Sequence, residues 1–271
     1  MISTLTKKGA PATLEALDIG AVDFLPKPQL NHNGSLQGYR LDVIEKVRGA
    51  ASANIHCLER RVLTQLDSTT LNTAAENTSF NRNCIIAIGA STGGTEAIKE
   101  VLVEMPASTP PILLTQHIPP AFSKTYAERL NQLCSIDVVE AEDGMKLEQG
   151  CAYLAPGDYH IKLIKKSSFY YVQVDQSDLV NRHRPSVDVM FDSVLNAANT
   201  FAVGVLLTGM GKDGASGLLR MKEAGCKTIV QDRESSVIWG MPGAAYEMGA
   251  AVDKLPLDEI HSKALNYCIK R

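Results

Sequence analysis

The sequence predicts an α/β protein: a doubly wound, mostly parallel sheet with helices on both faces. Short apolar runs alternate with segments whose apolar residues recur every three or four positions, as expected for strands that alternate with helices. The runs are apolar throughout rather than at every second position, which is typical of strands buried on both sides. At 271 residues the chain is long enough for one large domain or two small ones.

The N-terminal part contains few predicted elements. We expect a helix at 13–19, a strand at 22–25 and a helix at 41–47, which are too few to bury a core of their own. From 67 to 83 the composition shifts to Ser, Thr, Asn, Ala and Glu without periodicity, as in a linker. We therefore divide the chain into an N-terminal piece at 1–53, a linker at 54–82 and a main domain at 83–271.

The main domain repeats strand and helix. We expect strands at 84–88, 112–114, 201–207 and 228–231, and helices at 95–102, 122–133, 187–199, 214–224 and from about 257. Two alternating runs, at 160–164 and 170–174, predict a β-hairpin inserted into this pattern.

Composition narrows the class of protein. A net charge of −3 gives no reason to expect nucleic acid or an anionic membrane as a partner. No apolar run approaches the roughly 20 residues that cross a bilayer, and the N-terminus lacks a signal-peptide pattern. The six cysteines are scattered, which favours reduced thiols. We expect a soluble, cytoplasmic protein.

A glycine-rich turn after the first strand of the main domain is the most informative stretch. It places Ser91 between Gly89 and the pair Gly93 and Gly94. A serine at such a strand-to-helix turn is where α/β enzymes hold a nucleophile. The same turn could instead bind a phosphate through backbone N–H groups. The turn alone leaves both interpretations open.

Two further strand ends carry polar residues, His117 and Asp213. The carboxyl ends of parallel strands form one edge, so Ser91, His117 and Asp213 fit the roles of nucleophile, base and orienting carboxylate. Taken singly, His117 would more often be structural and Asp213 a helix cap. The order Ser, His, Asp differs from that of α/β-hydrolases.

The remaining motifs indicate no bound group. No H-E-x-x-H occurs and no histidine has a partner at metal-ligand spacing, so we predict no metal and no cofactor. His183 lies in a polar loop, where it could line a cleft or simply be solvated. A nucleotide- or phosphate-binding module, or another non-catalytic module, is the alternative to an enzyme. The sequence contains neither the G-x-G-x-x-G motif nor the P-loop spacing that nucleotide-binding proteins carry.

From residue 84 to about 269 the chain resembles the protein-glutamate methylesterases of bacterial chemotaxis, the CheB family. The shared strings are IGASTGGTEAI, TQHIPPAFSKTYAERLN, AYLAPGDYHI, NRHRPSVDVMF, GVLLTGMGKDGASGL and WGMPGAA. The resemblance implies a serine hydrolase that cleaves glutamate methyl esters on chemoreceptors, releasing methanol, and that also deamidates receptor glutamines.

The resemblance also assigns roles to residues. It implies that Ser91 is the nucleophile, His117 the general base and acid, and Asp213 the carboxylate that orients His117. It places the oxyanion hole at the backbone N–H of Met210 and at the turn after Ser91, at Thr92.

The N-terminal piece resembles the C-terminal half of a response-regulator receiver domain, a truncated flavodoxin-like fragment. Ser3 matches the switch residue after the fourth receiver strand, and Lys27 the phosphate-contacting lysine after the fifth. The receiver's first three strands, acidic pair and phospho-acceptor aspartate have no counterpart in this sequence. In full-length relatives the receiver covers the active site, and a chemotaxis histidine kinase is a partner.

Overall fold

The computed structural model describes residues 2–3, 13, 16–17, 19–27, 36–54 and 79–270. Its main sheet has seven strands in the order β11-β10-β9-β3-β4-β6-β5, and every neighbouring pair is parallel. The strands are β3 (Ile85–Ala90), β4 (Ile112–Gln116), β5 (Asp137–Glu140), β6 (Cys151–Leu154), β9 (Ala202–Leu206), β10 (Lys227–Gln231) and β11 (Asp253–Leu255).

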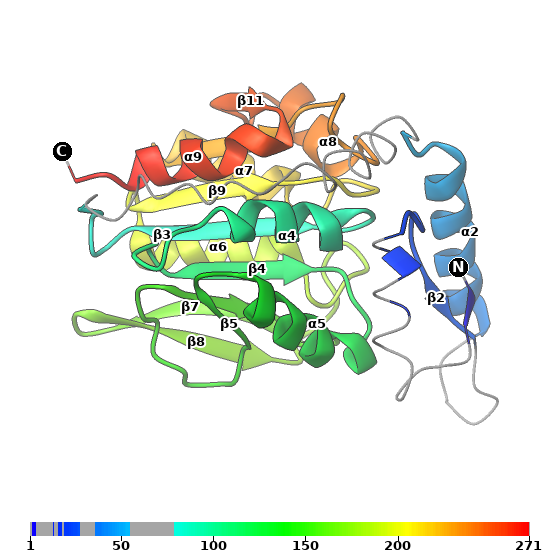
Figure 1. Ribbon diagram of the computed structural model, residues 1–271, viewed down its shortest axis with the longest axis horizontal. Coiled ribbons are helices and arrows are strands. Elements are labelled where there is room, and N and C mark those ends of the chain that lie inside the picture. The colour runs from blue at the N-terminus through cyan, green and yellow to red at the C-terminus, as the bar shows by residue number, and fades with distance from the viewer. Residues whose placement is uncertain are drawn as a thin grey trace.

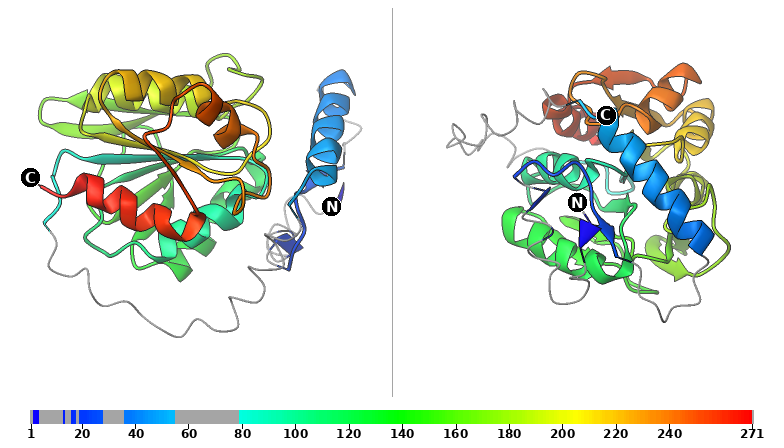
Figure 2. Two further views of the ribbon diagram at one scale, coloured as in Figure 1. Left: turned by 90° about the horizontal axis from the view of Figure 1, so that it is seen from above. Right: turned by 90° about the vertical axis from the view of Figure 1, so that its right-hand side faces the viewer.

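Helices cover both faces of this sheet (Figures 1 and 2). One face is covered by α4 (Gly94–Val103), α5 (Pro120–Leu133) and α9 (Leu257–Cys268). The other is covered by α6 (Val187–Ala198), α7 (Ala215–Glu223) and α8 (Met241–Glu247). The buried apolar side chains accordingly form two main clusters, one on each face. The predicted doubly wound fold is confirmed.

The predicted β-hairpin is also confirmed. Strands β7 (His160–Lys166) and β8 (Phe169–Asp175) pair antiparallel and form a sheet of their own. Along β7, the buried Ile161 and Leu163 join the cluster that contains α6. The hairpin therefore extends the core beside α6 rather than adding to the main sheet.

Four elements of the main domain were not predicted, namely β5, β6, β11 and α8. β5 and β11 end the sheet, and only part of each is buried, so neither gives the continuous apolar run expected of a central strand. Helix α8 begins with Met241, Pro242 and Gly243, and glycine has a low helix propensity. Packing against α7 and the sheet therefore stabilises a helix that its own sequence only weakly favours.

The N-terminal part contains β1 (Ile2–Ser3), β2 (Leu25–Pro26) and α2 (Leu36–Ala51). The strand predicted at 22–25 is wrong in position, since 22–24 form no ladder and β2 instead pairs parallel with β1. Residues 13, 16 and 17 of the predicted helix are helical, and α2 extends well beyond 41–47. Most of the predicted linker, 55–78, lies outside the described residues. β2 and α2 lie beside the carboxyl edge of the main sheet (Figure 1).

Candidate active site

Three neighbouring strands of the sheet, β4, β3 and β9, end at the same edge. The pairing of Ala90 with Gln116 places Ser91 and His117 just beyond the ends of β3 and β4. The backbone continues this register, because His117 N–H donates to Ala90 O at 3.2 Å and Ser91 N–H donates to Thr208 O at 3.0 Å. The residues predicted at three strand ends are thus neighbours in space.

The turn that contains Ser91 is held by small residues. Gly93 has a φ of 77°, in the left-handed region that favours glycine. A Cβ at Gly94 would lie 2.3 Å from Gln116 Oε1, so this position accepts no side chain without rearrangement. Gln116 Nε2 in turn donates to Ser91 O at 2.9 Å. The sequence therefore folds into a tight turn that fixes the backbone of Ser91.

His117 and Asp213 form the central pair of the site. His117 Nε2 lies 2.9 Å from Asp213 Oδ2, and the two side chains are only 9% and 1% exposed. An ionised carboxylate only accepts hydrogen bonds, so Nε2 carries the proton of the neutral ring and Nδ1 carries the lone pair. His117 Nδ1 is buried and has no hydrogen-bond partner in the described part of the chain. It is free to accept a proton.

Asp213 is surrounded by hydrogen-bond donors. Besides His117, its carboxylate accepts from Val187 N at 2.7 Å, Ser186 Oγ at 2.8 Å and Asn181 Nδ2 at 2.7 Å. Burial alone would raise the pKa of Asp213, but the hydrogen bond and charge of His117 lower it well below its usual range. The amide of Asn181 and the N–H of Val187 act in the same direction. Asp213 therefore stays ionised.

The structure brings His117 and Asp213 into contact and leaves Ser91 beside them. Among the described residues, the hydroxyl of Ser91 forms no hydrogen bond with His117. A Cβ at Gly209 would lie 2.8 Å from Ser91 Cβ, so the turn after β9 packs directly against the serine. Catalytic hydrogen bonds are often long in an enzyme without substrate and tighten when substrate binds.

The predicted oxyanion residues are Thr92 and Met210. Thr92 directly follows Ser91, and Met210 directly follows Gly209. Within the described residues, neither backbone N–H donates to another protein group. The side chain of Thr92 is engaged, since its Oγ1 donates to Asp23 Oδ2 at 2.7 Å. Met210 packs with Val22 and Ala53 against a small cluster around Val237. Two N–H donors are therefore available near Ser91.

Residues that sequence reasoning did not place in the site come from the loop before α6. The ring of His183 stacks on that of His117, with 3.8 Å between centroids and 16° between planes. The side-chain amide of Asn181 donates a hydrogen bond to Asp213 Oδ1. The polar string from 181 to 184 is visible in the sequence, but the stacking depends on folding that no local pattern reveals.

The N-terminal part lies against the same edge. Asp23 joins the hydroxyl of Thr92 to Lys46, whose Nζ is 2.7 Å from Asp23 Oδ2. The rings of Phe24 and Phe122 are 4.5 Å apart. Lys27, the lysine matched to the receiver, is exposed, and the backbone of Ser3 lies in β1.

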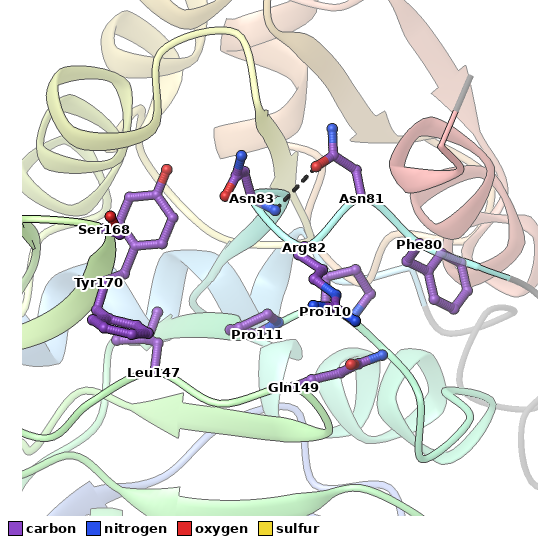
Figure 3. Close-up of a pocket in the computed structure, with 11 residues that line it drawn as sticks. Phe80, Asn81, Arg82, Asn83, Pro110, Pro111, Leu147, Gln149, Ser168 and Tyr170 are labelled. Atoms are coloured by element: carbon purple, nitrogen blue, oxygen red, sulfur yellow. Dashed lines mark hydrogen bonds between the residues drawn. The ribbon is translucent and has the colours of Figure 1, made fainter.

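A cavity of about 200 Å³ lies at the opposite edge of the sheet (Figure 3). Asn83 and Pro111, which line it, precede β3 and β4 respectively, and Tyr170 of the hairpin closes one side. It is therefore separate from the edge that holds Ser91. Across the described residues, no group of three or more His, Cys, Asp or Glu side chains is arranged to hold a metal ion.

This fold and these side chains define an α/β protein with the residue set of a serine hydrolase. A family model described as CheB methylesterase matches residues 86–264. The chain belongs to the CheB methylesterase family. That assignment supports the enzyme interpretation over a nucleotide-binding or non-catalytic module.

Individual relatives agree with this assignment. Protein-glutamate methylesterase/protein-glutamine glutaminase 2 of Saccharophagus degradans is 47% identical over 270 residues, which cover 100% of this chain and 77% of that protein. Protein-glutamate methylesterase/protein-glutamine glutaminase of Nitrosomonas europaea is 46% identical, covering 98% and 74%. The crystal structure of the Thermotoga maritima CheB methylesterase catalytic domain is 37% identical. It matches with a TM-score of 0.66 over 68% of this chain and 97% of that one.

Proposed function

We infer that this chain is a protein-glutamate methylesterase that also acts as a protein-glutamine glutaminase. Its substrates are the methyl-esterified glutamates, and some glutamines, of methyl-accepting chemotaxis receptors. The observation that carries this function is the buried His117–Asp213 pair beside Ser91, in a chain about 47% identical over its whole length to relatives of that name. The activity places the protein in chemotactic adaptation.

In the proposed mechanism, Ser91 Oγ attacks the ester carbonyl while His117 Nδ1 takes the hydroxyl proton. Asp213 stabilises the imidazolium through Nε2. The N–H groups of Met210 and Thr92 hold the oxyanion of the tetrahedral intermediate. Collapse of the intermediate breaks the C–O bond, and His117 returns its proton to the departing methanol.

Water completes the cycle. His117 Nδ1 takes a proton from a water molecule that attacks the acyl-serine. The second tetrahedral intermediate then breaks its bond to Ser91 Oγ, which receives that proton from His117, and releases the glutamate side chain. With a glutamine substrate the same steps release ammonia in place of methanol. No metal or cofactor enters this sequence, since the three side chains and two N–H groups supply every proton transfer and charge contact.

Domain division, location and regulation form the remaining part of the proposal. We place a receiver fragment at 1–53, a linker at 54–82 and the methylesterase domain at 83–271, in the cytoplasm. The parallel pairing of β1 with β2 supports the receiver fragment at 1–53, because receiver strands also pair in parallel. A histidine kinase as partner stays a prediction of the family resemblance. No described helix is long and apolar enough to cross a membrane.

Methanol release from methylated receptor membranes tests the activity. The wild-type chain is expected to release methanol, and Ser91→Ala to lower the rate by at least about a thousandfold without loss of folding. Unchanged thermal unfolding of the variant is the control for folding. Release by Ser91→Ala at the wild-type rate would remove Ser91 from the mechanism, and no release by the wild type would contradict the function.

A further inference from the structure

The side-chain amide of Asn181 joins two carboxylates. Its Nδ2 lies 2.7 Å from Asp213 Oδ1 and 2.6 Å from Asp188 Oδ2. A primary amide nitrogen carries two hydrogen atoms, so one bond goes to each carboxylate. Neither Asn181 nor Asp188 has a part in the mechanism described above.

The bond to Asp213 Oδ1 acts on the orientation of the catalytic carboxylate. Asp213 Oδ2 faces His117, and Oδ1 accepts from Asn181 and from Ser186 Oγ. Donors on Oδ1 fix the plane of the carboxylate, which keeps Oδ2 aimed at His117. Without Asn181, Ser186 Oγ and Val187 N still donate to the carboxylate, but a water molecule takes the place of the amide and fixes no direction.

Asp188 is the second carboxylate, in the first turn of α6. Its Oδ1 accepts from Gly217 N at 2.6 Å, and its side chain is largely buried. Burial is the main reason that the pKa of Asp188 is raised, and the charge of Asp213 raises it further; the N–H of Gly217 and the amide of Asn181 lower it. Asn181 donates to both carboxylates, which offsets the repulsion between them.

The backbone of the loop is adapted to this contact. Asn181 has a φ of 51° and Arg182 a φ of 69°, both in the left-handed region. Asparagine is one of the few residues that enter this region readily, and such conformations cluster at functional sites. The same loop carries His183, which stacks on His117. One loop therefore contacts both members of the His117–Asp213 pair.

We propose that Asn181 is a positioning residue for ester hydrolysis. One of its hydrogen bonds orients Asp213, and the other ties Asp213 to Asp188 at the start of α6. Asn181 acts through Asp213 and does not touch the ester. The inference rests on the proposed function, because it takes Ser91, His117 and Asp213 as the reacting groups.

Asn181→Gly tests the proposal, because glycine removes the amide and accepts a φ of 51° without strain. We expect kcat for methanol release to fall about tenfold, with KM unchanged within about twofold, since the loss is confined to the transition state. Asn199→Gly is the matched control. Asn199 also has a φ of 51° and is also exposed, but it lies at the other end of α6 from the bonds to Asp213, so kcat is expected to stay at the wild-type value.

A double-mutant cycle separates positioning from a general structural effect. In the Asp213→Asn background, measured at high enzyme concentration, Asn181→Gly is expected to change kcat less than about twofold, because its route to His117 is already broken. A loss of equal size in both backgrounds would overturn the proposal. So would a wild-type kcat for Asn181→Gly.

A second variant, Asn181→Asp, tests the proposal if Asn181→Gly is destabilised. If Asn181→Gly unfolds at a clearly lower temperature than the wild type, Asn181→Asp keeps the shape and the backbone preference while replacing the donor with an acceptor. It is expected to lower kcat by at least as much as glycine, and full activity would overturn the proposal. If the wild type itself releases no methanol, the proposed function fails instead, before any Asn181 variant is compared.

Discussion

The imidazole of His183 lies flat against that of His117, with ring centroids 3.8 Å apart. Burial is the main cause that lowers the pKa of His183 to about 3, and the charge of His117 lowers it further. Arg182 and Lys46 act in the same direction, and Asp213 opposes them. His183 is therefore uncharged at neutral pH. It offers His117, the proposed catalytic base, a planar neutral surface that does not compete for the carboxylate of Asp213.

Replacing His183 tests whether the flat ring is what matters. We expect His183→Phe to keep at least about half of the wild-type kcat, because a phenyl ring preserves stacking on His117. His183→Ala removes the ring, leaves His117 free to tilt, and is expected to lower kcat about tenfold. Methanol release measures both variants. Equal losses for phenylalanine and alanine would indicate instead that a ring nitrogen of His183 is needed.

His183 also gives stability a dependence on pH. An ordinary histidine has a pKa near 6.5, so between about pH 6.5 and pH 3 the unfolded chain binds a proton at His183 that the folded chain does not. The free energy of unfolding therefore falls as pH falls through this range. At pH 5 the contribution is about 1–2 kcal/mol, after allowance for the partial exposure of the ring.

Urea unfolding of the wild type and His183→Phe at pH 7.5 and pH 5 checks this effect. Phenylalanine cannot take up the proton, so the variant is expected to gain about 1–2 kcal/mol relative to the wild type on going to pH 5. A difference between the two proteins that does not change with pH would show that His183 takes up a proton as readily folded as unfolded.

Gly209 sets the distance between the turn after β9 and Ser91. A Cβ at this position would lie 2.8 Å from Ser91 Cβ and 2.4 Å from Met241 Sδ. We expect Gly209→Ala to displace Ser91 and lower kcat about a hundredfold, because errors of about 1 Å at a nucleophile cost this much. The measurement is methanol release together with thermal unfolding.

Gly211→Ala is the control for Gly209→Ala. A Cβ at Gly211 would meet no atom within 4 Å, although its φ of 82° strains alanine by about 1–2 kcal/mol. This variant is expected to lose stability but to keep kcat within about threefold. Similar kcat losses in both variants would point to general distortion of the turn rather than to contact with Ser91.

Much of the main domain was predictable because its central strands are apolar along their whole length. The pattern located β3 and β9, and the polar residues after them led to Ser91 and Asp213. β5 and β11 were missed because sheet-edge strands are partly exposed and carry no such signal. The contact between Cys84 and Cys268, 184 positions apart, shows how tertiary packing joins positions that share no local pattern.

Only part of the site was predictable, because local patterns locate strand ends but not the contacts that a loop makes. Ser91, His117 and Asp213 each follow a strand, so topology alone brings them together. Asn181 and His183 belong to a loop, and their place depends on left-handed backbone at 181 and 182. A periodicity argument gives no information on such a loop. The string that contains these residues was visible, but not what each side chain contacts.

Asp23 of the N-terminal part contacts Thr92 of the turn that holds Ser91. Asp23 Oδ2 accepts from Thr92 Oγ1 and from Lys46 Nζ, both at 2.7 Å, which fastens the N-terminal part beside the proposed oxyanion hole. A Cβ at Gly49 of α2 would lie only 3.3 Å from Met210 Sδ, so α2 lies close to the second oxyanion residue. We expect a segment held there to restrict the approach of a receptor substrate to Ser91.

Asp23→Ala is therefore expected to raise kcat/KM for methanol release several-fold, mainly through a lower KM, because access rather than chemistry changes. Asp192→Ala is the matched control: it removes an aspartate paired with Arg220 at 2.7 Å on the exposed surface of α6, and activity should not change. A kcat/KM for Asp23→Ala at or below the wild-type value would mean that the N-terminal part supports the turn at Thr92 instead of restricting access to it.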